Sequence, residues 1–246
     1  MMLYPLEPIA RWVIQHIATM SRRLNLGVLS LSPPREGRYL IIIGDGTPDD
    51  YAMTLVAWLS NGQETAFITK PARTGLSCLE LLRTVYLRYA PHLRSVLLAV
   101  DRDNDQLTAI TDKAHRKLVE HAFNIVEQRE LSGGWIKLFS CTWRPGASVR
   151  VVVLVNGMAG GKEEARRQLY LRDTVEVHFL EAGKSVLGRE RILEVLSGAG
   201  GDPKDAWRLL GREEQWTIFR ALRDRRLLKN TFRQHHEAFR LLLEEP

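Results

Sequence analysis

The chain has 246 residues, of which 45% are hydrophobic and 26% charged, the composition of an ordinary globular protein. No apolar run approaches the roughly 20 residues of a membrane-spanning helix, and Glu7 and Arg11 stand where a signal peptide would be apolar, so we expect no membrane span and a cytoplasmic protein. The formal net charge of +6 favours a polyanionic partner such as nucleic acid. Cys78 and Cys141 have no Cys or His neighbour at a metal-ligand spacing, which predicts core thiols in a reducing compartment.

The first 37 residues are expected to form an N-terminal helical extension and a linker. Ile9, Val13, Ile17 and Met20 recur at helical spacing, and the paired prolines of "SPPREG" (32–37) cannot continue a helix.

From residue 38 to 185 the sequence predicts alternating strands and helices. The predicted strands are "YLIIIG", "ETAFIT", "SVLLAV", "FNIVEQ", "WIKLFS", "VRVVVLVNG" and "VEVHF", and the predicted helices lie near 52–59, 77–90, 110–122 and 162–171. This alternation is typical of an α/β fold, in which helices flank a mostly parallel central sheet in three Rossmann-like layers. Residues 186–246 are predicted to be helical, with Asp202 capping a helix that starts at Pro203.

Two acidic clusters follow buried strands. "DGTPD" follows "YLIIIG", and "DRDND" follows "SVLLAV". Because ligands gather at the carboxyl ends of parallel strands, five aspartates are expected to converge there: Asp45, Asp49, Asp101, Asp103 and Asp105. Oxygen-only ligands favour Mg²⁺ or Mn²⁺, which would relieve the repulsion between the carboxylates.

Residues 39–105 resemble the Toprim (topoisomerase-primase) domain, and the length and helical tail are most similar to small stand-alone archaeal Toprim-like proteins. That family has a strand followed by Glu-Gly-x-x-Asp and, after a helix, a strand and a helix, a second strand followed by Asp-x-Asp. The resemblance implies that Asp101 and Asp103 bind the metal, with Asp105 as a direct or water-mediated ligand. It also implies that Asp45 and Asp49 are the catalytic acids.

Asp45 departs from the family pattern, because it stands in place of a glutamate and is one methylene shorter. A loss of about 1 Å of reach costs on the order of 10²-fold in rate where geometry is tight. The resemblance therefore implies a Mg²⁺-dependent nuclease or, alternatively, a non-catalytic nucleic-acid-binding or regulatory protein with a degenerate site. The chain is too short to add the further domains of a topoisomerase, and no template-binding module of a primase is found.

Other interpretations of these motifs remain open. "DGTPD" also suits a capped turn, and PIN-like nucleases place acids at the same strand ends. A calcium loop starting at Asp101 would end at Asp112, but Gln106 stands where it needs glycine. "NGMAGGKEE" (156–164) departs from phosphate-loop spacing and is expected to be a turn. His235 and His236 diverge on a helix and are expected at the surface.

The stretch 220–233 is rich in basic residues and could follow a nucleic-acid backbone while a nearby aromatic side chain stacks on a base. The candidate binding residues are Arg220, Arg223, Arg225, Arg226, Lys229 and Arg233. The alternative is an amphipathic helix whose apolar residues belong to the core and whose arginines are solvated.

Overall fold

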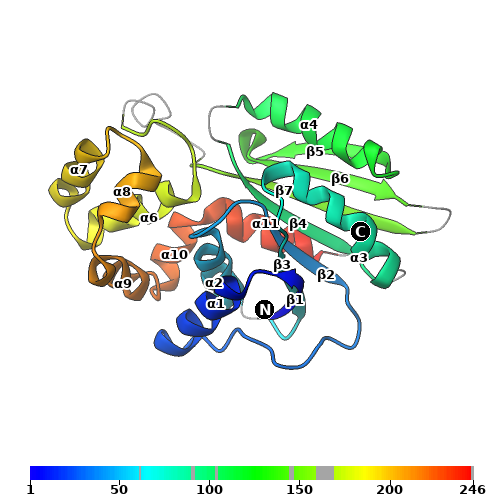
Figure 1. The fold of residues 1–246 in the computed structure, drawn as a ribbon, viewed down its shortest axis with the longest axis horizontal. Coiled ribbons are helices and arrows are strands. Elements are labelled where there is room, and N and C mark those ends of the chain that lie inside the picture. Colours follow the sequence, from blue (N-terminus) through cyan, green and yellow to red (C-terminus); the bar gives the residue numbers. More distant parts are fainter. Residues whose placement is uncertain (61, 90–91, 103–104, 144–146, 159–168, 245–246) are drawn as a thin grey trace.

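The computed structural model describes residues 1–60, 62–89, 92–102, 105–143, 147–158 and 169–244, with the backbone alone for residues 86–89. Within them lies a seven-stranded sheet in the order β1-β3-β2-β4-β7-β6-β5 (Figure 1). The strands are β1 (Met2–Ile9), β2 (Tyr39–Ile43), β3 (Thr65–Lys70), β4 (Ser95–Asp101), β5 (Asn124–Leu131), β6 (Ile136–Thr142) and β7 (Ser148–Asn156). The strands from β1 to β7 in this order are parallel, whereas β6 and β5 are antiparallel to their neighbours. The predicted α/β fold with a mostly parallel sheet is confirmed.

Helices cover both faces of the sheet, which is why its central strands are apolar throughout. In β2, Leu40 and Ile42 join one core cluster, and Ile41 and Ile43 join the other. The first face is covered by the 3-10 helix η1 (Gly75–Leu79), α3 (Glu80–Tyr89) and α4 (Leu107–Glu120). The second is covered by α1 (Arg11–Arg23), α2 (Asp49–Leu59) and helices of the C-terminal region. The result is three layers (Figure 1).

The N-terminal segment contains a strand that the sequence did not predict. β1 pairs in parallel with β3 at the edge of the sheet, and α1 follows with Val13, Ile17 and Met20 buried. The predicted helical face is present, but it starts only after residue 10, and residues 2–9 belong to the same sheet as the central strands.

The predicted strand "VEVHF" is wrong, because these residues open helix α6 (Val175–Val186). Six consecutive residues from Val175 to Leu180 are buried, so this helix has no polar face in its first half. Without such a face the 3.6-residue period is hidden, and the β-branched residues resemble a strand. The predicted helix at 162–171 falls largely on residues 159–168, which lie outside the described part of the chain.

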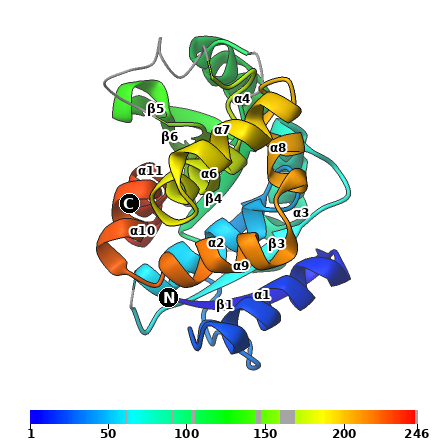
Figure 2. The same ribbon diagram turned by 90° about the vertical axis from the view of Figure 1, so that its left-hand side faces the viewer.

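The C-terminal region is helical, as predicted. It contains α7 (Arg189–Gly198), α8 (Pro203–Leu209), α9 (Arg212–Ala221), α10 (Arg225–Thr231) and α11 (Arg233–Leu243). The carboxylate of Asp202 accepts hydrogen bonds from the backbone N–H groups of Lys204 and Asp205, so the predicted cap of α8 is confirmed. Helices α6 to α9 gather at one end of the molecule (Figures 1 and 2). Among the described residues, none of the helices is both long and apolar enough to cross a membrane.

Candidate functional site

Three neighbouring parallel strands end in polar side chains at the same level. In the register of β2 and β4, Ile43 lies opposite Ala99, so Asp45 and Asp101 each follow a paired residue by two positions. In the register of β4 and β7, Asp101 lies directly opposite Asn156. The chain leaves β2 toward β3 on one side and returns to β4 on the other, so the three strand ends lie at a switch point of the topology. In open α/β sheets such points bind ligands.

Gly44 allows β2 and β4 to approach closely at this edge. Its backbone N–H donates to the carbonyl oxygen of Ala99 at 2.8 Å, and a Cβ at position 44 would lie 2.4 Å from that oxygen. Asp45 follows immediately, and its Oδ2 accepts a 2.7 Å hydrogen bond from the backbone N–H of Asp101. Asp45 is therefore tied to the end of the neighbouring strand.

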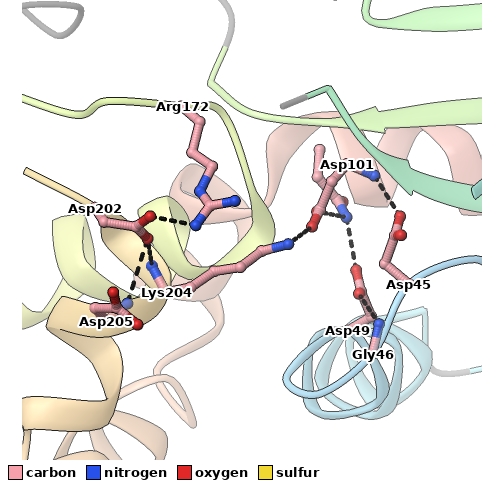
Figure 3. A network of polar contacts seen from close by, with 9 residues as sticks. Asp45, Gly46, Asp49, Asp101, Arg172, Asp202, Lys204 and Asp205 are labelled. Carbon is pink, nitrogen blue, oxygen red and sulfur yellow. Dashed lines mark hydrogen bonds and ion pairs between the residues drawn. The ribbon is translucent and has the colours of Figure 1, made fainter. Parts of the chain in front are cut away.

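Asn156 joins the two acidic motifs. Its side-chain Nδ2 donates to Oδ1 of Asp49 at 2.6 Å and to Oδ1 of Asp101 at 3.0 Å. Asp49 is the first residue of α2, and its other oxygen accepts from the backbone N–H of Gly46 at 3.2 Å. The predicted convergence of Asp45, Asp49 and Asp101 is thus present (Figure 3). A single buried amide, that of Asn156, donates to two of these carboxylates.

His235 of α11 contacts the side chain of Asn156 in the interior, so the expectation that this histidine lies at the surface is wrong. It is fully buried, and its Nε2 lies 3.1 Å from Oδ1 of Asn156. Since that oxygen can only accept, Nε2 carries the ring proton. Burial, with His178 alongside, holds the pKa of His235 well below its ordinary value, so the ring is neutral.

Burial governs the protonation of the carboxyl groups. Burial, followed by the charges of Asp101, Glu176 and Asp45, raises the pKa of Asp49 well above its ordinary value. Burial, followed by the charge of Asp101, raises the pKa of Glu176, in the first turn of α6, to about 7. Burial thus favours the protonated form of both Asp49 and Glu176.

A lysine from the C-terminal region supplies positive charge. Lys204, in the first turn of α8, extends to Asp101 and places its Nζ 2.7 Å from Oδ2 (Figure 3). The side chain of Asp101 is 2% exposed, so this ion pair is largely removed from solvent.

Two clefts open on either side of the acidic strand ends. One, of about 570 Å³, is lined by Asp49, Asp101, Glu176, Lys204 and Trp207 among others. The second, of about 450 Å³, lies between η1 and α4. Its charged lining residues are the acids Asp45, Asp101, Asp105 and Glu120 and the bases Arg102, Lys113, Arg116 and Lys117. Acidic strand ends and basic side chains thus share the second cleft.

Of the two remaining predicted metal ligands, the structure describes Asp105, which does not join the network. Asp105 lines the second cleft, but its carboxylate is half-exposed and pairs with Lys113 at 2.5 Å. Asp103 lies outside the described residues. Within the described ranges, no three His, Cys, Asp or Glu side chains are grouped so that they could hold a metal ion.

The basic stretch of the C-terminal region is exposed, but its aromatic neighbours are not. All six candidate residues are at the surface, namely Arg220, Arg223, Arg225, Arg226, Lys229 and Arg233. Trp216, Phe219 and Phe232 are buried in the core, so none of the three presents a face on which a base could stack. Arg225 instead lies over the ring of Trp58, with its guanidinium carbon 4.9 Å from the ring centre.

Sequence reasoning missed Asn156, Glu176, Lys204 and His235. Asn156 had a signal, because it is a polar residue at the end of a buried apolar run, as Asp45 and Asp101 are. The other three come from helices far along the chain, and nothing in their local sequence points to strand ends more than 70 residues away.

Comparison with known proteins identifies no relative. No family model matches the chain, and no curated protein or solved structure matches it significantly.

Proposed function

We propose that this chain is a Toprim-like protein that acts on nucleic-acid phosphodiesters, as a Mg²⁺- or Mn²⁺-dependent nuclease. The observation that carries the proposal is the joining of the two acidic motifs at one sheet edge, where Asp45 bonds to the backbone of Asp101 and Asn156 bridges Asp49 and Asp101. Burying two carboxylates on one amide costs free energy, and a structural turn does not require it. Carboxyl groups perturbed in this way are concentrated at functional sites.

The donor atoms suit a hard divalent cation in kind, although the described carboxyl groups are not clustered as a metal site. All the acids at the edge offer oxygen, and Asp101 already accepts a cationic group, the ammonium of Lys204. Under the proposal Asp101 and Asp103 hold the ion and Asp105 contacts it directly or through water. When bound, such an ion neutralises phosphate charge and lowers the pKa of bound water.

The charge distribution supports a nucleic-acid partner. Lys113, Arg116 and Lys117 of α4 line the cleft that also contains Asp45 and Asp101, with Lys113 paired to Asp105 and Lys117 to Glu120. These cations would attract a phosphate backbone into this cleft, beside Asp45 and Asp101. The exposed basic residues of 220–233 form a second candidate surface for the backbone. Two free cysteine thiols support the cytoplasmic location that belongs to the same proposal.

Cleavage of labelled single- and double-stranded DNA and RNA with Mg²⁺ or Mn²⁺ tests the proposal. Asp101→Ala and Asp103→Ala should abolish cleavage, whereas Asp112→Ala, at an exposed position of α4, should leave it unchanged. Undiminished cleavage by the Asp101 and Asp103 variants would sink the assignment. Asp45→Glu restores the glutamate of the family motif and shows whether the shorter side chain limits the rate.

A second function, non-catalytic binding of nucleic acid, is favoured by one observation. Lys204 already neutralises Asp101, and Asp45 is engaged by a backbone N–H group. A protein of this kind would retain nucleic acid in a filter-binding assay at millimolar Mg²⁺ and leave it intact. Cleavage that disappears with Asp101→Ala would rule this alternative out.

A further inference from the structure

His16 of α1 forms a close pair with Asp50, the second residue of α2. Its Nδ1 lies 2.6 Å from Oδ2 of Asp50, and the other oxygen of that carboxylate accepts a 2.9 Å hydrogen bond from the backbone N–H of Tyr51. Because a carboxylate oxygen only accepts, Nδ1 carries a ring proton in this pair. The side chain of Asp50 is fully buried, whereas 29% of the His16 side chain is exposed. A buried carboxylate thus orients a histidine that reaches the surface.

The ring of His16 is held in one orientation with its second nitrogen accessible. It stacks on Tyr51, with the ring centres 4.7 Å apart, and packs against Trp12 at 5.6 Å. Within the described part of the chain, Nε2 makes no hydrogen bond, and it is not one of the buried side-chain atoms that lack a partner. Solvent therefore reaches Nε2. A carboxylate on one ring nitrogen and an accessible second nitrogen make up a proton-transfer pair.

His16 and Tyr51 line the larger cleft together with Asp49, Asp101 and Lys204. Small-molecule sites measure about 300–1,000 Å³, so this cleft of about 570 Å³ has room for a nucleotide. Asp101 lines both clefts, and a phosphate held there would have the cations of α4 on one side and the cleft of His16 on the other. In a displacement at phosphorus, the attacking and leaving oxygens lie on opposite sides.

The acids of the strand ends are poorly suited to protonate a leaving group. Both oxygens of Asp49 accept hydrogen bonds from other groups of the protein, and its surface is only 1% exposed. Oδ2 of Asp45 accepts from the backbone N–H of Asp101. A nucleoside oxygen leaves more readily when a side chain gives it a proton, and imidazole is the side chain used most often for this purpose. His16 offers an accessible nitrogen on the cleft that Asp101 also lines.

We propose that His16 is a catalytic residue that gives the proton on Nε2 to the leaving oxygen, with Asp50 as the residue that positions the ring; this inference rests on the proposed nuclease function. The attacking water releases a proton to solvent as its oxygen bonds to phosphorus. The bond between phosphorus and the leaving nucleoside oxygen breaks with its electron pair on that oxygen, which takes the proton from Nε2. The ring then regains a proton from solvent.

His16→Asn tests the inference, because the asparagine amide can still donate to Asp50 but has no proton to give to a leaving group. The matched control is His92→Asn, since His92 is exposed and precedes β4, at the opposite edge of the sheet from the strand ends. Asp50→Asn tests the positioning role. Thermal melting checks folding, and His16→Gln replaces His16→Asn if the latter does not fold.

Single-turnover cleavage is measured in Mn²⁺ on a labelled oligonucleotide and on two copies in which sulfur replaces the 3′ or the 5′ bridging oxygen of the cleaved phosphodiester. The copy that releases a free thiol has its sulfur in the leaving position. A thiolate is a much weaker base than the oxygen anion of an alcohol, so it leaves without a proton from the protein. Loss of a proton donor therefore slows cleavage of the oxygen ester alone, whereas a structural defect slows cleavage of both esters.

We expect His16→Asn to cleave the oxygen ester at least about 10²-fold more slowly than the wild type and the thiol-releasing ester within about threefold of it, with His92→Asn unchanged on both. Asp50→Asn should show the same pattern, with a loss of at least about tenfold on the oxygen ester. Equal losses on the two esters in His16→Asn, or no loss on either, would overturn the role of His16 and leave the proposed function standing. Absence of cleavage of every substrate by the wild type would overturn both.

Discussion

Replacing Asn156 by leucine tests whether one amide organises the acidic edge. Leucine has the same number of side-chain heavy atoms, branched at the same position, but neither donates nor accepts hydrogen bonds. The substitution leaves three buried groups without their present partner, namely Oδ1 of Asp49, Oδ1 of Asp101 and the Nε2–H group of His235.

The size of the effect follows from these contacts. Each orphaned group costs about 1–3 kcal/mol, and burial of the leucine returns about 1–2 kcal/mol. We therefore expect Asn156→Leu to lower the free energy of unfolding by about 3 kcal/mol near neutral pH. The free energy of unfolding of a native domain is only about 5–15 kcal/mol, so this loss is large.

The loss in free energy of unfolding caused by Asn156→Leu, called the deficit below, should also depend on pH, and the direction of this dependence can be derived. Losing a donor disfavours the ionised form of Asp49, so the pKa of Asp49 in the folded state rises further above its unfolded value. A carboxyl group with a raised folded pKa contributes stability at low pH and loses it as the pH rises. The deficit should therefore be smaller at pH 5 than at pH 8.

Urea unfolding at pH 5 and pH 8, with EDTA present, measures both effects. Asn124→Leu is the control, because Asn124 is exposed on β5 and makes one 3.3 Å hydrogen bond to Thr142. That variant should change stability by no more than about 0.5 kcal/mol. A deficit below about 1 kcal/mol for Asn156→Leu, or one that grows toward pH 5, would refute the reasoning.

Three further predictions concern other parts of the structure. Lys204→Met should lower stability by about 3 kcal/mol in EDTA, since it unpairs a buried carboxylate, and millimolar Mg²⁺ should restore part of the loss; melting curves without any recovery would contradict a cation site. Because the pKa of Glu176 is raised to about 7, wild-type stability should fall by up to about 3 kcal/mol between pH 4.5 and 7, and Glu176→Gln should flatten the profile. Gly157→Ala should cost at least about 2 kcal/mol in urea unfolding, because its Cβ would lie 2.1 Å from the ring of Trp135 at a φ of +139°. Gly62→Ala is the control, because its Cβ would meet other atoms only at 3.7 Å or more and its φ is not positive; an equal loss in both variants would show that the close contact relaxes.

The central strands were predictable because burial on both faces makes their sequence unmistakable. β2, β4 and β7 are apolar runs that end in polar residues, and the strand order places two of those ends in register with the third. The convergence of Asp45 with Asp101 therefore follows from sequence and topology. β1 escaped prediction because its sequence, MLYPLEPI, contains two prolines and lies at an edge, where prolines are tolerated.

The rest of the site could not be predicted from local patterns. The helix that carries Glu176 is buried on all sides in its first half, so its sequence shows no helical period. His235 lies on an apolar helix face, and its hydrogen-bond partner, Asn156, lies 79 residues earlier in the chain. Lys204 follows a helix cap that the sequence shows well, yet its charged end contacts Asp101 on a central strand. These are tertiary contacts, and a single sequence contains no local signal for them.

The position of His235 in the last helix bears on the order in which the acidic strand ends gain their final geometry. The strands β2, β4 and β7 lie within the first 156 residues, but the histidine that supports Asn156 arrives only with α11. During synthesis, which proceeds from the N-terminus, the sheet can assemble while the acidic edge still lacks this support. Docking of α11 then completes the site, so the edge acquires its final geometry as one of the last events of folding. The contact between His235 and Asn156 thus ties the final geometry of these strand ends to completion of the fold.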